Sequence, residues 1–238
     1  MRDAGSLAER LRNLFLGSRD GNAAGTPAAP SAPAASRRSS RGEKEVIVSR
    51  QSRGLEQFFT YIRGQAGLTI LDLGGASQAN INFITNLGHK LHTVDFLGSM
   101  EETFGMDDVT DQSNPGRIDY FLRQNLEYPD DTFDGVLVWD TLEYMAPALL
   151  SATLERLYRI TRPGSYLLAF FQSDERAAAV PFYGFRIHDF NALQVSQRGA
   201  RKPVQLFNNR TLEKLFQRFG SVKFFLTRES LREVIVKR

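Results

Sequence analysis

The residues best suited to chemistry are a glycine-rich turn and a carboxylate about twenty positions after it. An apolar run from Thr69 ends in Asp72-Leu-Gly-Gly-Ala76, and helix-like sequence begins directly afterwards. Gly74 and Gly75 permit a sharp turn and let the backbone approach a ligand closely. A second apolar run ends at Asp95, whose carboxylate can accept hydrogen bonds from two ribose hydroxyls. The alternative role for Asp95 is an ordinary cap at the end of a strand.

Four apolar segments, separated by helix-like sequence, carry these and the other candidate residues. The segments are 69–77, 92–95, 133–140 and 162–171. Such an order is typical of a parallel sheet with crossover helices. In parallel sheets ligands bind beyond the carboxyl ends of the strands, so we expect the glycine and aspartate residues to meet at one site.

The periodicity of apolar residues predicts the other elements. We expect strands at 68–73, 90–95, 121–124, 133–139 and 165–171, and helices at 55–64, 77–87, 147–160 and 211–219. A closing strand pair is expected at 222–227 and 231–236, joined by Arg228-Glu-Ser230. Residues 174–208 interrupt the alternation and predict an insertion.

The order of the four segments resembles the class I S-adenosylmethionine-dependent methyltransferases, over about residues 50–238. The resemblance implies an α/β fold: a three-layer sandwich around a mostly parallel, seven-stranded Rossmann-like sheet that ends in an antiparallel hairpin. In the family pattern, glycines occupy the second, fourth and sixth positions after the acid. Here those positions hold Gly74, Ala76 and Gln78, so the glycine motif is degenerate.

The resemblance implies an S-adenosylmethionine site. Asp95 would bind the ribose and Asn125 the adenine edge, because an amide both donates and accepts hydrogen bonds. Asp140 would lie near the methionine amino group. The ring of Trp139 can attract a sulfonium cation, although this tryptophan can equally belong to the core. The expected cofactor-binding residues are Asp72, Gly74, Gly75, Ala76, Asp95, Asn125, Leu126, Trp139 and Asp140.

The insertion at 174–208 lies where the family often binds its methyl acceptor. It supplies aromatic residues and the basic residues Arg198 and Arg201, so the expected acceptor is aromatic, acidic or both. The expected substrate-binding residues are Tyr144, Tyr183, Arg186 and His188. The alternative is a solvated hairpin on the sheet edge. We assign no catalytic residue, because methyl transfer mainly requires alignment and exclusion of water.

The first 42 residues differ in composition from the rest. Residues 1–20 predict a short amphipathic helix with a capping box at Ser6 and Glu9, and residues 21–42 a disordered linker rich in Ala, Pro and Ser. The methyltransferase-like domain is expected at 43–238. Three alternatives are open for residues 1–20: a helix that binds a protein partner, a helix that packs on its own domain, or no stable helix in water.

Composition limits the function classes. The chain has no cysteine and three histidines, which argues against disulfides and a metal site and fits the cytoplasm. It has no apolar run long enough to cross a membrane. Its first residues lack the apolar stretch of a secretory signal, so we expect no such leader. Residues 43–145 carry seven basic against seventeen acidic residues, whereas residues 146–238 carry sixteen against seven. The two halves can neutralise each other, or the basic half can attract an anionic partner.

Three hypotheses about function remain open. The first is a methyltransferase acting on a small molecule. The second is an RNA or protein methyltransferase, which the basic carboxy-terminal half supports but the absence of a nucleic-acid-binding module opposes. The third is a non-catalytic methyltransferase-like module for interaction with a partner, because fold alone does not establish function.

Overall fold

The structure is a computed structural model that describes residues 46–105, 110–226 and 231–238. The predicted helix at 1–20, the linker at 21–42 and the turn at 228–230 lie outside these described residues. Among the described helices, none combines the length and apolar character needed to cross a membrane.

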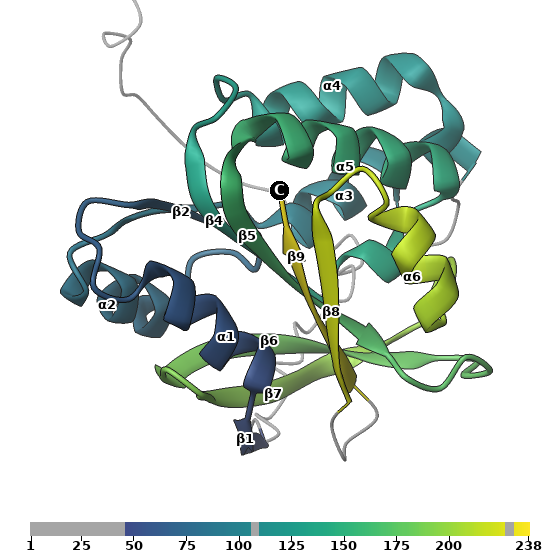
Figure 1. Ribbon diagram of the computed structural model, residues 1–238. Coiled ribbons are helices and arrows are strands. Elements are labelled where there is room, and N and C mark those ends of the chain that lie inside the picture. Colours follow the sequence, from purple (N-terminus) through teal and green to yellow (C-terminus); the bar gives the residue numbers. More distant parts are fainter. Residues whose placement is uncertain (1–45, 106–109, 227–230) are drawn as a thin grey trace, which may run out of the picture. The chain divides into compact units, whose positions relative to one another are not determined.

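A six-stranded sheet forms the centre of the molecule, and its first four strands run parallel to one another (Figure 1). β9 runs antiparallel to both of its neighbours, as predicted for the closing strand pair. In spatial order the strands are β3 (Lys90–Thr93), β2 (Thr69–Asp72), β4 (Phe133–Trp139), β5 (Thr161–Gln172), β9 (Leu231–Lys237) and β8 (Ser221–Leu226).

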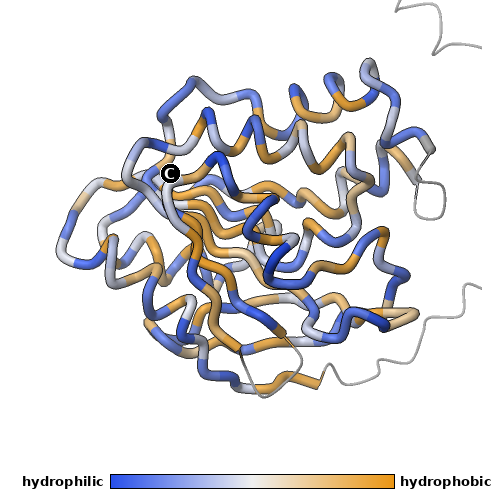
Figure 2. Tube along the Cα trace, turned by 45° about the vertical axis from the view of Figure 1, so that its right-hand side comes forward, coloured by the Kyte–Doolittle hydropathy of each residue, from blue (hydrophilic) through white to orange (hydrophobic). Residues whose placement is uncertain are grey.

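The two faces of the sheet are apolar because both are covered. Successive side chains of a strand point to opposite faces, so Val136 and Val138 enter one core cluster and Leu137 and Trp139 the other. One face carries α3 (Phe96–Phe104), α4 (Pro115–Leu126), α5 (Pro147–Ile160) and α6 (Asn209–Leu215); the other carries α1 (Arg53–Ile62) and α2 (Gln78–Asn86). Figure 2 shows the resulting apolar centre between polar outer surfaces. This is the predicted three-layer arrangement.

The predicted number of seven strands is wrong by one, because the segment expected as a strand at 121–124 lies inside α4. Asn114 caps this helix by accepting hydrogen bonds from two main-chain N–H groups, and Pro115 occupies its first position. The buried residues recur at helical spacing, namely Ile118, Phe121, Asn125 and Leu126. Together, the cap, the proline and the helical spacing of the buried residues favour a helix more strongly than the four-residue apolar stretch favours a strand.

A separate antiparallel sheet combines two strands of the predicted insertion with one strand from residues 47–51. β6 (Val180–Asp189) and β7 (Ala192–Arg201) form a hairpin, which we call the arm, and β1 (Ile47–Gln51) pairs with β7. The inner face of the arm contributes Phe185, Ile187, Leu193 and Val195 to the core cluster beneath α1 and α2. The sequence did not predict β1, whose partner lies about 145 residues along the chain.

Asn80 of α2 fixes the position of the arm through its side chain. The amide nitrogen donates to the carbonyl oxygen of Phe185 at 3.2 Å, and the amide oxygen accepts from the N–H of Ile187 at 2.7 Å. Asn80 is 1% exposed, so these hydrogen bonds are shielded from water. The arm is therefore a firmly attached part of the domain.

Candidate active site

Asp95 lies beside the glycine-rich turn, as expected from the order of the apolar segments. Gly75 has a φ of 83°, a conformation that favours glycine, and its N–H donates to the carbonyl oxygen of Val94 at 3.0 Å. Gly74 and Asp95 form an isolated β-bridge. The ends of β2 and β3 are thereby joined at the point where both strands leave the sheet.

Asp72, the last residue of β2, holds this turn in place through its side chain. Its carboxylate is buried and accepts three hydrogen bonds, from the N–H of Gly74 at 2.9 Å, the indole N–H of Trp139 at 2.6 Å and the amide of Asn80 at 2.9 Å. Burial raises the pKa of Asp72, and these three hydrogen bonds act in the opposite direction. Asp72 therefore holds the turn, the indole and α2 together without lining a cavity itself.

Trp139 covers the turn. It is 1% exposed and stacks on Phe185 of the arm, with ring centroids 4.9 Å apart and ring planes at 6°. A Cβ at position 74 would lie 2.7 Å from the indole Cδ1, so the indole needs a glycine there. The φ of Trp139 is 59°, a strained conformation for a bulky residue. The tryptophan thus belongs to the core and also borders the site.

A cavity of about 180 Å³ lies beyond the carboxyl ends of β2, β3 and β4, closed on one side by the arm. Five predicted site residues meet there: Gly74, Asp95, Trp139, Asp140 and Tyr183. Four more lining residues come from the predicted insertion, which the sequence analysis expected to supply aromatic rings and positive charge to the acceptor: Phe182, Phe185, Arg198 and Arg201. The sequence gave no indication of a site role for the other lining residues, which are Leu73, Leu97, Gly98, Glu101 and Thr141.

Asp95 caps α3 and is exposed toward the cavity. One carboxylate oxygen accepts from the N–H of Gly98 at 3.1 Å. A Cβ at position 98 would lie 2.6 Å from the other oxygen, so glycine gives this carboxylate its room. The cap that the sequence offered as an alternative is present, and the exposed carboxylate retains acceptor capacity for ligand hydroxyls.

Two buried carboxylates follow β4. Asp140 accepts a hydrogen bond from the N–H of Tyr183 at 3.0 Å, and burial raises its pKa to about 7. Glu143 accepts from the N–H of Gln172 at 2.8 Å, and burial raises its pKa to about 8. The other oxygen of Glu143 has no partner among the described residues. Only the tertiary structure reveals that Glu143 is buried, because its sequence position resembles an exposed acid after a strand.

An ion pair connects the arm to α3. Arg201 of β7 pairs with Glu101, and its guanidinium lies 4.1 Å from the ring centroid of Phe182. Burial lowers the pKa of Arg201, while the nearby carboxylate of Asp95 acts in the opposite direction. The charge distribution of the sequence is consistent with this ion pair, because the insertion is rich in basic residues and residues 43–145 are rich in acidic ones.

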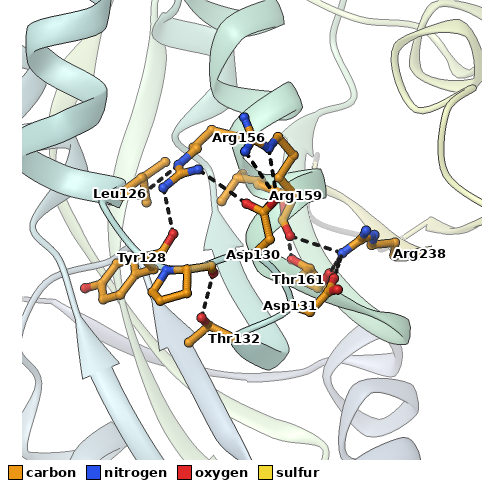
Figure 3. A network of polar contacts seen from close by, with 11 residues as sticks. Leu126, Tyr128, Asp130, Asp131, Thr132, Arg156, Arg159, Thr161 and Arg238 are labelled. Atoms are coloured by element: carbon orange, nitrogen blue, oxygen red, sulfur yellow. Dashed lines mark hydrogen bonds and ion pairs between the residues drawn. The ribbon is translucent and has the colours of Figure 1, made fainter.

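Asn125 and Leu126 do not line the cavity. The amide of Asn125 donates to the carbonyl oxygen of Phe121 at 2.9 Å, and Leu126 lies in the core. Arg156 of α5 donates to the carbonyl oxygens of Leu126 and Tyr128, at 2.9 and 2.7 Å (Figure 3). This segment leads into the first residue of β4, so it lies at the opposite end of that strand from Trp139.

The remaining predicted residues, which are Ala76, Tyr144, Arg186 and His188, do not line the cavity. Ala76 is exposed after the turn, and Tyr144 is buried with no described partner for its hydroxyl. His188 is exposed near the end of β6, and Arg186 is half-buried on the same strand. Within the described parts of the chain, no group of three or more histidine or carboxylate side chains is arranged for a metal ion.

Solved structures with related folds include three methyltransferases. The 1,6-didemethyltoxoflavin-N1-methyltransferase of Burkholderia thailandensis, with 1,6-didemethyltoxoflavin and S-adenosylhomocysteine bound, is 12% identical over 78% of this chain and 76% of that chain, with a TM-score of 0.44. A methyltransferase of Archaeoglobus fulgidus is 18% identical over 77% and 91%, with a TM-score of 0.45. Phosphoethanolamine N-methyltransferase 2 of Haemonchus contortus, bound to phosphomonomethylethanolamine and S-adenosylhomocysteine, is 12% identical over 78% and 52%, at 0.44.

A family model described as a methyltransferase domain matches residues 45–222, which is most of the described chain. The comparison with curated proteins gives no significant match. Members of this family use S-adenosylmethionine as the methyl donor. The match confirms the resemblance based on the four segments, and the chain belongs to the class I, Rossmann-like S-adenosylmethionine-dependent methyltransferases.

Proposed function

We propose that this protein transfers a methyl group from S-adenosylmethionine to a small-molecule acceptor. The observation that carries the proposal is the meeting of four expected cofactor residues, Gly74, Asp95, Trp139 and Asp140, around one cavity. They come from three separate strand ends, and the edge where the strand ends of a parallel sheet meet is where such folds bind their ligands.

The residues present fit the cofactor. Asp95 is exposed with acceptor capacity for the ribose hydroxyls, and Asp140 would attract the amino group. The cavity of about 180 Å³ is smaller than the roughly 300–1,000 Å³ of sites that enclose a whole drug-sized ligand. Gly74 and Ala76 are exposed beside it, so the rest of the cofactor would lie along this rim. S-adenosylmethionine supplies a methyl group activated by its sulfonium.

The arm supports the choice of a small acceptor. Phe182 and Tyr183 give the cavity aromatic surface, and Arg198 gives it a positive charge. These groups suit an acceptor that is aromatic, acidic or both. The arm also covers one side of the cavity, where it would exclude water and align the acceptor with the methyl group. A cytoplasmic location remains a prediction from the composition.

A second candidate function is a non-catalytic member of the family. The observation in its favour is the position of the Trp139 indole, which fills the space directly above Gly74. Only the first glycine of the family pattern is kept in this turn. Under this alternative, the Asp72–Trp139 hydrogen bond would serve stability, and the domain would bind a partner without methyl transfer.

The test is transfer of a labelled methyl group. The full chain is incubated with methyl-labelled S-adenosylmethionine and a cell extract separated into small-molecule, RNA and protein fractions. We expect label in the small-molecule fraction, and none from the Asp95→Ala variant. Label in the RNA or protein fraction would mean that the acceptor is RNA or protein rather than a small molecule. Absence of S-adenosylhomocysteine binding by calorimetry would favour the non-catalytic alternative.

A further inference from the structure

The apolar inner face of the arm continues past the core onto β1, which lies beside β7 (Figure 1). Directly opposed residues of an antiparallel pair project to the same face of a sheet. Val48 of β1 is opposite Val195 of β7, so both lie on the inner face, and Val46 follows two positions away. Val195 is 7% exposed, whereas Val48 is 48% and Val46 71% exposed. Two valines of this face are therefore in contact with water.

A second cavity, which we call the valine cavity, lies over these residues and has a volume of about 270 Å³. Its described lining residues are Val46, Val48, Arg50, Tyr183, Val195 and Gln197. The three valines form an apolar wall, and the amide of Gln197 provides a polar edge. An apolar cavity of about 150 Å³ binds benzene. The valine cavity therefore has room for a group larger than one aromatic ring.

Tyr183 connects the valine cavity to the candidate active site, because it lines both cavities. On the active-site side, its main-chain N–H donates to the carboxylate of Asp140 at 3.0 Å. Its ring centroid lies 6.0 Å from that of Phe185, which also lines the active site. The two cavities are therefore adjacent, and Tyr183 lies between them.

The charge in the valine cavity is compensated within the protein. Arg50 is the one charged side chain among the described lining residues, and it is buried. Burial raises the pKa of Glu233, whereas hydrogen bonds and the positive charge of Arg50 act in the opposite direction. Since Arg50 already interacts with this carboxylate, no anion is needed to balance it. A charged ligand group would lose its hydration against the valines without gaining a partner, so the cavity favours an uncharged group.

We propose that the valine cavity binds an uncharged, apolar part of the methyl acceptor, of the size of about two fused aromatic rings. The atom that receives the methyl group then lies beyond Tyr183, in the candidate active site. The proposal rests on the proposed function and deepens it by naming the substrate class. Binding of such a group removes the exposed surface of Val46 and Val48 from water together with the surface of the ligand.

The first experiment titrates three probes into the full chain with excess S-adenosylhomocysteine, by isothermal titration calorimetry. The probes are 2-naphthol, which is uncharged and has two rings, phenol, which has one ring, and naphthalene-2-sulfonate, which has two rings and a negative charge. We expect 2-naphthol to bind more tightly than the other two. Tighter binding of the sulfonate would overturn the proposed preference for an uncharged group.

The second experiment fills the cavity and compares two positions on the same strand. Val48→Phe places a ring inside the valine cavity and should weaken 2-naphthol roughly tenfold or more. Ile47→Phe is the matched control, because Ile47 is 47% exposed but lies opposite Ser196, on the other face of the sheet. It should leave the affinity unchanged. The thermal midpoint of each variant shows that it folds.

The fate of the proposed function is measured separately. Neither Val48 nor Ile47 lines the candidate active site, so both variants should bind S-adenosylhomocysteine as the parent does. Methyl transfer to the extract should fall in Val48→Phe and persist in Ile47→Phe. The subsite is overturned if the parent binds no 2-naphthol, if Val48→Phe binds it equally well, or if it competes with S-adenosylhomocysteine. In each case the proposed function still stands if the parent binds S-adenosylhomocysteine and transfers label.

A second copy of this chain is the other occupant that an experiment must separate. Sedimentation velocity compares the parent with Val48→Asp, which places a charge on the exposed valine surface. We expect the two proteins to sediment equally, which supports a cavity that is free to bind the acceptor. A parent dimer that Val48→Asp dissociates would make this surface an interface between copies and would overturn the acceptor subsite.

Discussion

The indole N–H of Trp139 donates to the buried carboxylate of Asp72 at 2.6 Å, across 67 positions of sequence. This contact joins the end of β4 to the end of β2, the two strands at the centre of the site. It also holds the indole over Gly74 and against Phe185 of the arm. One hydrogen bond therefore connects the glycine-rich turn, the sheet and the arm.

Removing this donor should destabilise the domain. Trp139→Phe leaves a buried carboxylate with two of its three hydrogen bonds, and we expect a loss of about 1–3 kcal/mol in the free energy of unfolding. Urea unfolding measures it. In a double-mutant cycle with Asp72→Ala, which removes the acceptor, the two losses should be non-additive. Additive losses would mean that the hydrogen bond contributes nothing specific.

Gly74→Ala should be costly for a steric reason. The new Cβ would lie 2.7 Å from the indole, so the indole must move, and overpacking of this kind costs about 1–3 kcal/mol. Gly116→Ala is the matched control, because its Cβ would meet only Asn114 Oδ1 at 3.4 Å. Thermal unfolding compares the two variants. Equal, small effects at both positions would contradict the proposed contact.

Asp95 has two roles that substitutions can separate. Asp95→Ala removes the cap of α3, at about 0.5–2 kcal/mol of stability. It also removes the expected ribose contacts, at about 2–4 kcal/mol of S-adenosylhomocysteine binding. Asp95→Asn should keep the cap, because its amide oxygen can still accept from Gly98, but bind the ribose more weakly. Calorimetry and urea unfolding measure the two effects. Unchanged affinity in Asp95→Ala would refute the ribose assignment.

The stability should fall as pH rises. Asp140 and Glu143 have folded-state pKa values of about 7 and about 8, raised by burial from 3.8 and 4.5. The folded protein therefore holds protons that the unfolded chain releases. Their stabilising contribution is complete below the ordinary pKa values and is lost as pH rises through about 7 and 8.

The urea midpoint, measured from about pH 5 to about pH 9, should therefore decrease. Glu143→Gln stays neutral and keeps an oxygen that can accept from the N–H of Gln172, so it should flatten this decrease. Glu175→Gln, at an exposed position, serves as the control and should leave the slope unchanged. A midpoint that rises with pH in the parent, or a slope that Glu143→Gln leaves intact, would contradict the assignment.

The sequence by itself determined the sheet and most of the helices that cover it. Apolar runs such as 133–139 and 165–171 are too long and too continuous to be exposed, and helical spacing of leucines at 147–160 fixes α5. These signals are local, because each element carries its own pattern. The strand expected at 121–124 failed for the same reason, since a short apolar stretch is compatible with a strand or a helix until the cap at Asn114 is considered.

The contacts that make the site were decided only by the tertiary structure. Gly74, Asp95 and Asp140 could be anticipated because strand ends in a parallel sheet converge at one edge. Three contacts could not be anticipated: the pairing of β1 with β7, the ion pair between Glu101 and Arg201, and the stacking of Trp139 on Phe185. Each joins segments far apart in sequence. Their register depends on how the arm packs against the finished core, and no local pattern of residues encodes that.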